Sequence, residues 1–180
     1  MFNKKNIKED YSKRIFFWLV IIVGIGAVVR LLWLGNYSLH YDEAREYGLS
    51  FGALSNIVEA AKKNSSNPPL HLFLIKFFSN FGISDFYARI VPTLSNILTI
   101  FFVYQFTNIL FKDQISALFS SFFFSISFTQ FRFSNEVRPY SLSLLFASLI
   151  LLSFELAIQK PEERKWKYFF AILSSIGFFA

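Results

Sequence analysis

Long stretches without charged residues constrain the possible folds of this chain more than any other feature of its sequence. Four of them, residues 15–34, 90–111, 115–131 and 139–158, carry almost no charged side chain. An α-helix needs roughly 20 apolar residues to cross a hydrocarbon core about 30 Å thick, and these stretches are about that long. We therefore expect an all-α, polytopic membrane bundle of four spans. A fifth span is expected to begin near residue 168 and to be incomplete at residue 180.

Composition excludes the main soluble classes. The chain is 54% hydrophobic and only 17% charged, and it contains 26 Phe and no Cys. These values exclude a water-soluble globule, a disordered chain and a disulfide scaffold. No basic stripe with interleaved aromatic residues marks a polar segment, so we expect no nucleic-acid partner. We interpret residues 1–180 as one membrane domain, the N-terminal part of a longer protein, because the chain stops within an apolar run.

The basic residues predict the topology. Segments rich in Lys and Arg stay in the cytoplasm, and ten of the 18 Lys and Arg lie in residues 1–14, at Lys112 and in residues 159–168. These three segments are expected inside, and the loops 35–89 and 132–138 outside. The apolar segment 69–81 is then a surface or re-entrant helix rather than a span. We expect a multi-pass plasma (inner) membrane protein with a cytoplasmic N-terminus, in which Arg30 snorkels or meets an acidic partner.

The first outer loop begins with an acidic pair, Asp42 and Glu43. Apolar residues follow at spacings of three and four, which predicts one amphipathic helix along the membrane surface; they are Ala44, Tyr47, Phe51, Leu54, Val58 and Ala61. Asp42 stands where this helix begins. It therefore either caps the helix, with Glu43 favouring its positive end, or takes part in chemistry, and the two roles are compatible.

Two further polar motifs fall on the same predicted side. Pro69 and His71 open a short helix, where they serve either a simple loop-to-helix entry or a site. Glu136 and Arg138 precede the fourth span, either as solvated flanks or as functional groups, and Tyr140 follows as a candidate interface anchor. Together these motifs put carboxylates, a histidine and arginines on one face. Such a face suits chemistry between a lipid-borne and a water-borne substrate.

The order of these motifs is similar to that of a known family. RLLWLGNYSLHYDEAREYGLS, then NPPLHLFLIKFFSNFGISDFYARIVPTLSNILT, then FSNEVRPYSLSLLF resemble the N-terminal part of the C-fold glycosyltransferases. That group includes protein O-mannosyltransferases and bacterial aminoarabinose transferases. The resemblance implies a membrane enzyme with its active site on the outer face. It also implies a polyprenyl-phosphate-linked sugar as donor and a hydroxyl acceptor on a protein, lipid or glycan.

The resemblance also suggests roles for individual residues. Asp42 matches the acidic residue at the family's reaction centre, and we expect it to be the base of an inverting transfer. Glu43 and Glu136 are the other acidic candidates; some relatives carry Asp near the position of Arg138, so Glu136 either takes that second acidic role or the role is absent. Arg138, Arg89 and Tyr140 are the candidates for the donor phosphate. Pro69 and His71 are the candidates for contacting substrate.

Metal binding and two other functions stay open at this stage. No spacing typical of a metal site is present, although Glu136 and His71 are able to contribute ligands to a divalent metal. A transporter is the first alternative function, but it would place charges at mid-depth in several spans, and none of the four has one. An assembly or scaffold subunit is the second, and it leaves Asp42, Glu43 and Arg138 explained only as caps and flanks.

Overall fold

The computed structural model describes residues 4–63 and 68–180, and helices make up 81% of it. No strand occurs in these described ranges. The helices are α1 (Lys4–Leu32), α2 (Tyr41–Ser50), α3 (Leu54–Lys63), α4 (Pro69–Ser79), α5 (Asp85–Phe111), α6 (Gln114–Ile126), α7 (Phe128–Ser134), α8 (Tyr140–Gln159) and α9 (Arg164–Gly177). The protein is therefore an all-helical membrane protein, as the apolar stretches predict.

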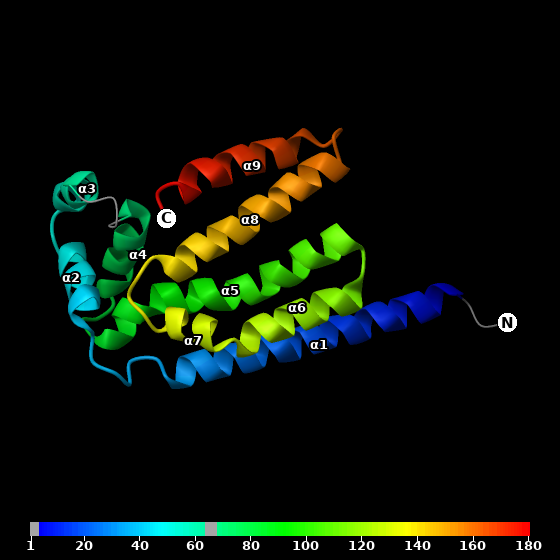
Figure 1. Cartoon of the computed structure of the whole chain (residues 1–180), viewed down its shortest axis with the longest axis horizontal. Coiled ribbons are helices and arrows are strands. Elements are labelled where there is room, and N and C mark those ends of the chain that lie inside the picture. Colours follow the sequence, from blue (N-terminus) through cyan, green and yellow to red (C-terminus); the bar gives the residue numbers. More distant parts are fainter. Residues whose placement is uncertain (1–3, 64–67) are drawn as a thin grey trace.

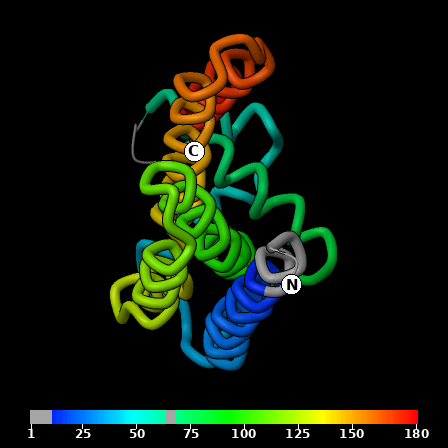
Figure 2. The backbone as a smooth tube through the Cα atoms, turned by 90° about the vertical axis from the view of Figure 1, so that its right-hand side faces the viewer, coloured from blue at the N-terminus to red at the C-terminus, as the bar shows by residue number. Residues whose placement is uncertain are grey.

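The long helices run side by side and reverse direction at each turn (Figure 1). Within the described residues, three helical segments are long and apolar enough to cross a membrane: Tyr11–Leu32, Asp85–Phe111 and Tyr140–Gln159. The short helices α2, α3 and α4 gather at one end of the bundle, which we call the loop end. The start of α1 and the turns after α5 and α8 lie at the opposite end. Figure 2 looks along the bundle from that opposite end.

Helix α5 is the centre of the bundle. It packs against α8, α6, α4, α1 and α7. Half of the residues in its most apolar 18-residue stretch are buried, against 28% in the corresponding stretches of α1 and α8. Its buried face carries many small or polar residues, which let helix backbones approach closely in a membrane. These include Ala88, Thr93, Ser95, Asn96 and Thr99.

The third apolar stretch, 115–131, is not one continuous helix. Helix α6 is 13 residues long and ends at Ile126, because Ser127 is extended with φ −62° and ψ 121°. Helix α7 then begins at Phe128 and carries the chain back to the loop end, where the carbonyl of Ser134 accepts a hydrogen bond from Thr93 Oγ1 at 2.7 Å. At about 20 Å, α6 alone is shorter than the hydrocarbon core. We propose that α6 and α7 cross the membrane together.

The break is held by Arg30, whose environment differs from the prediction. Arg30 does not snorkel, since its side chain is fully buried, and no acidic side chain among the described residues pairs with it. Its Nε donates to Asn96 Oδ1 at 2.8 Å, and its Nη1 donates to the carbonyls of Gly26 and Ser125 at 3.0 Å each. Ser125 stands in the last turn of α6, where helix carbonyls lack amide partners. Arg30 thus ties α1, α5 and α6 together through neutral oxygens.

The outer segment predicted as one amphipathic helix is two. Helix α2 ends at Ser50, and α3 begins at Leu54. Lys76 Nζ, from α4, binds the freed end of α2 by donating to the carbonyl of Gly52 at 2.7 Å and to that of Ser50 at 3.5 Å. Of the predicted apolar stripe, Tyr47 is buried within the protein, whereas Ala44, Phe51, Leu54 and Val58 are exposed. The buried face of α2 consists of Glu43, Glu46, Tyr47 and Ser50.

Candidate functional site

The predicted site residues come from four neighbouring elements at the loop end. Asp42 and Glu43 lie in the first turn of α2, His71 in the first turn of α4, and Arg89 in the second turn of α5. The segment between α7 and α8 supplies the others. All four elements share a small apolar core, in which Tyr47, Ile75, Ala88, Val91 and Val137 pack together. This core fixes the elements relative to one another.

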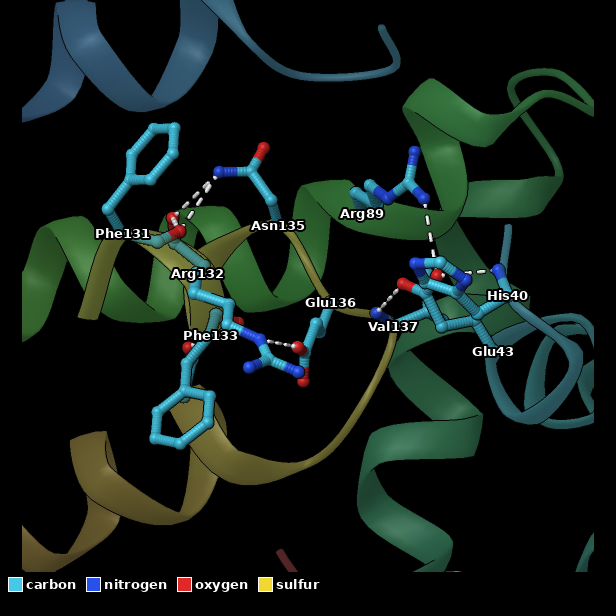
Figure 3. A network of polar contacts seen from close by, with 11 residues as sticks. His40, Glu43, Arg89, Phe131, Arg132, Phe133, Asn135, Glu136 and Val137 are labelled. Atoms are coloured by element: carbon cyan, nitrogen blue, oxygen red, sulfur yellow. Dashed lines mark hydrogen bonds and ion pairs between the residues drawn. The ribbon is translucent and has the colours of Figure 1, made fainter. Parts of the chain in front are cut away.

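Glu43 is the hub of this arrangement (Figure 3). Its Oε2 accepts from the backbone N–H of His40 at 2.8 Å and from Arg89 Nη2 at 3.3 Å. Its Oε1 accepts from the backbone N–H of Val137 at 2.7 Å. His40, not Asp42, is the N-cap of α2, and Glu43 at the third helical position bonds back to it. Glu43 is buried, so its contacts join α2, α5 and the segment before α8.

Arg89 holds the loop that leads into α2. Its Nη1 donates to the carbonyl of Tyr37, and its Nη2 donates to the carbonyl of Ser38 at 3.3 Å as well as to Glu43. The guanidinium is buried, and its Nε has no partner among the described residues. Because protein oxygens occupy both terminal nitrogens, this geometry fits loop positioning better than the predicted contact with a donor phosphate.

A second buried carboxylate, Glu46, was not among the predicted site residues. Its Oε1 accepts from Arg138 Nη1 at 2.7 Å. Its Oε2 lies 3.4 Å from Nδ1 of His71, and both side chains are almost completely buried. Neither nitrogen of His71 makes a hydrogen bond within the described residues. His71 is therefore buried against Glu46. This position fits support of the Glu46 side chain better than the predicted contact with substrate.

Arg138 is held from one side and open on another. Its side chain is 25% exposed, and the centre of its guanidinium lies 5.9 Å from the centre of the Tyr140 ring. Partial burial lowers the pKa of Arg138, but a hydrogen bond with Tyr140 and the charges of Glu46, Tyr140 and Asp42 outweigh this effect and raise the pKa above its ordinary value. Arg138 therefore stays cationic. Glu136, the other charged residue of this motif, pairs with Arg132 at 2.7 Å.

Asp42 differs from the other carboxylates of the cluster. It is exposed, and no described residue donates a hydrogen bond to it or forms an ion pair with it. Its charge nevertheless acts on Arg138. Asp42 is thus an accessible carboxylate beside a cation that is itself partly exposed.

Two hollows flank the segment between α7 and α8. The first, the Arg138 hollow, has a volume of about 400 Å³ and is lined by Arg138, Tyr140, Pro68, Ser143 and Phe178. The second, the aromatic hollow, has a volume of about 300 Å³ and is lined by Trp33, Tyr37, His40, Phe131, Arg132 and Glu136, with Glu43 and Arg89 beside them. Pro69 lines neither of these, but a more apolar hollow between α3 and α4. In residues 4–63 and 68–180, no three His, Asp or Glu side chains are arranged to hold a metal ion.

Comparison with known families decides between the functional classes. The profile of the dolichyl-phosphate-mannose-protein mannosyltransferase family matches residues 66–180. The chain belongs to this family. The matched part contains His71, Arg89, Glu136, Arg138 and Tyr140. No curated protein and no solved structure gives a significant match.

Membership confirms the resemblance noted from the sequence motifs. A chain of this mannosyltransferase family is a membrane glycosyltransferase, which argues against the transporter and the scaffold subunit. Its apolar helices imply a lipid bilayer as surroundings, and the family implies a lipid-linked sugar donor and an acceptor. Asp42 and Glu43 precede the matched residues. The case for these two therefore rests on the geometry at the loop end.

Proposed function

We propose that this protein transfers a sugar from a polyprenyl phosphate to a hydroxyl group in a single inverting step. The acceptor oxygen attacks the anomeric carbon while the bond from that carbon to the phosphate oxygen breaks. The hydroxyl proton passes to the carboxylate of Asp42, and polyprenyl phosphate leaves with the bonding electron pair. One base in line with one leaving group is sufficient for this reaction.

The observation that carries this proposal is that an accessible carboxylate, Asp42, lies at the same end of the bundle as Arg138, a partly exposed cation that Glu46 restrains. Asp42 is exposed and without a partner in the described residues, whereas Glu43 and Glu46 are buried and engaged. A base must reach its proton, and only Asp42 of these three is accessible. Arg138 lies close enough for its pKa to respond to Asp42. A guanidinium binds phosphate oxygens through paired donors, so Arg138 suits the charge of the leaving group.

Glu46 supports this role by fixing Arg138. Its bond to Nη1 restrains the guanidinium, while a quarter of the Arg138 side chain remains exposed to a ligand. Tyr140 packs its ring against the same guanidinium. Together they hold the cation in place before the phosphate arrives, which lowers the reorganisation needed during the reaction.

We further propose that the loop end lies on the outer face of the plasma (inner) membrane. Ten of the 18 Lys and Arg lie in the segments at the opposite end, namely residues 4–14, Lys112 and residues 159–168. Basic residues stay on the cytoplasmic side. With the N-terminus in the cytoplasm, the donor is used outside, at the membrane surface.

The proposal is tested by the fate and the configuration of the sugar. The protein is reconstituted into vesicles with a panel of short-chain polyprenyl-phosphate hexoses, each of defined anomeric configuration, and with candidate hydroxyl acceptors. We expect acceptor-dependent release of polyprenyl phosphate, and NMR of the product should show the opposite anomeric configuration. Retention of configuration would contradict the single step, because it requires a second displacement.

A further inference from the structure

The aromatic hollow carries paired rings and paired charges, and no role has been assigned to it so far. It lies between the end of α1, the loop before α2 and helix α7. Its volume of about 300 Å³ is at the small end for ligand sites, which suits a single ring rather than a large molecule.

The rings offer a flat apolar surface. Trp33 and Tyr37 stack with their ring centres 5.8 Å apart and their planes inclined by 5°. Phe131 meets Trp33 edge-on at 6.4 Å. Trp33 and Tyr37 remain 45% and 59% exposed, respectively. The face of an aromatic ring is electronegative and apolar, so it attracts the weakly positive C–H face of a sugar ring.

The charges of this hollow are compensated within the protein. Arg89 is paired with Glu43, and Arg132 with Glu136 at 2.7 Å. A phosphate would therefore meet a carboxylate beside each arginine. Both arginines that line the aromatic hollow are thus neutralised by a carboxylate partner. A neutral ligand therefore suits this hollow better than an anion.

Polar groups beside the rings suit hydroxyl groups. Glu136 is 21% exposed and Arg132 is 68% exposed, and both line the hollow. A carboxylate accepts from hydroxyls, and a guanidinium donates to them. His40, which is also exposed on this wall, adds a third polar group. Stacking rings with a few polar groups at their edge form a surface that fits a hydroxyl-rich ring.

We infer that the aromatic hollow binds a neutral pyranose ring, the terminal sugar of a glycan acceptor. The backbone N–H of Val137 binds Glu43 on the wall of the aromatic hollow, and the next residue, Arg138, lines the other hollow. A sugar in one hollow and a phosphate in the other would thus lie on the two sides of one short segment. The role as acceptor rests on the proposed transfer reaction, whereas the binding of a pyranose does not.

Fluorescence of Trp33 measures this binding without any turnover. The three tryptophans are Trp18, Trp33 and Trp166, so replacing Trp18 and Trp166 by Phe leaves Trp33 as the reporter. The reconstituted protein is titrated with methyl α-mannopyranoside and with methyl β-glucopyranoside. Sorbitol, an open-chain polyol, and inorganic phosphate are titrated in parallel.

We expect a saturable change in Trp33 emission with at least one pyranoside and none with sorbitol or phosphate. In this background, Tyr37→Leu should weaken binding by a few-fold to about tenfold, because one stacked ring is lost. Tyr41→Leu is the matched control, since Tyr41 is 84% exposed outside the hollow, and it should bind normally. Arg138→Ala should also leave pyranoside binding unchanged.

Three results would overturn the inference. A response to phosphate alone would make the hollow an anion site. Equal responses to sorbitol and to the pyranosides would show that no ring is recognised. The absence of any saturable response would leave Trp33 and Tyr37 as interface anchors of α1. None of these three binding results affects the sugar-transfer assay, which measures release of polyprenyl phosphate. Failure of pyranose binding is therefore distinguishable from failure of the proposed reaction.

Discussion

Arg30 in the bundle and Arg138 at the loop end both carry a guanidinium into the protein, but their surroundings differ. Arg30 is completely buried, and its partners are neutral oxygens of Asn96, Gly26 and Ser125. Arg138 is partly exposed and bonds a buried carboxylate, Glu46. One arginine is enclosed by three helices, whereas the other is restrained but open on one side. The comparison separates a cation that stabilises packing from a cation that is able to bind a ligand.

The polar residues around each arginine extend this contrast. Asn96, which accepts from Arg30, donates to Gln130 Oε1 and to Ser141 Oγ at 3.2 Å each, and so links α5 to α7 and α8. Gly26 allows the close approach at this crossing, because a Cβ there would lie 2.5 Å from Ile100 Cδ1 and 3.3 Å from Ser125 Cβ, so the Ile100 side chain would have to shift. At the loop end the carboxylates of Glu43 and Glu46 are buried, whereas that of Asp42 is exposed. The bundle positions the loop end, where the chemistry is proposed.

The largest expected effect on stability is at Arg30. Arg30→Leu leaves the oxygens of Asn96 and Ser125 without their donor, which costs about 2 to 4 kcal/mol. The midpoint of thermal unfolding in detergent should fall by about 5 to 15 °C. Arg164→Leu, at the start of α9, is the control and should shift it little. Equal midpoints for the two variants would show that Arg30 does not hold the bundle.

A smaller effect, on turnover, is expected at Glu46. Glu46→Gln removes the charge that orients Arg138, so kcat should fall about tenfold. The donor KM should change less than about threefold, because the released guanidinium still attracts phosphate. Glu59→Gln, a change of an exposed carboxylate on α3, should leave both constants unchanged. Steady-state kinetics that show an unchanged kcat for Glu46→Gln would remove Glu46 from its positioning role.

The smallest expected effect is on stability at low pH, and it concerns Asp113 at the opposite end of the bundle. Asp113 caps α6, and hydrogen bonds from the Ser116 side chain and from the amides of Ser116 and Ile115 hold its pKa below 3.8. Its contribution to stability is therefore complete above pH 3.8 and is lost as pH falls through the lowered pKa. Thermal unfolding of Asp113→Asn should differ from that of the unchanged protein at neutral pH, and the difference should shrink below pH 4. A constant difference over this range would contradict the assignment.

The amino-acid sequence predicts the helices well where length and hydropathy decide. The stretch 90–111 lies within α5, which begins at Asp85 and ends at Phe111, and the stretch 139–158 matches α8 (Tyr140–Gln159) to within one residue at each end. The break at Ser127 was not predictable in this way, since it depends on Arg30 reaching a carbonyl 95 residues further along the chain. Apolar spacing alone cannot indicate such a contact between distant segments.

The residues that gather at the loop end were predicted in part. The sequence motifs identified Asp42, Glu43 and Arg138 as functional candidates, and all three lie at the loop end. Glu46 was missed because the predicted stripe assigned the buried face of α2 to apolar residues. A signal was present: Glu46 follows Glu43 by three residues, so both carboxylates lie on one helix face. Two arginines in later segments, Arg89 and Arg138, are the partners that draw this face inward.

The most direct measurement compares turnover and donor binding in an Asp42→Asn variant. Turnover should fall by about 10²- to 10⁴-fold, because the base is lost. Binding of a short-chain polyprenyl phosphate should stay within about threefold of normal, since Arg138 and Glu46 are unchanged. Near-normal turnover in this variant, in vesicles with a working donor and acceptor, would contradict the account.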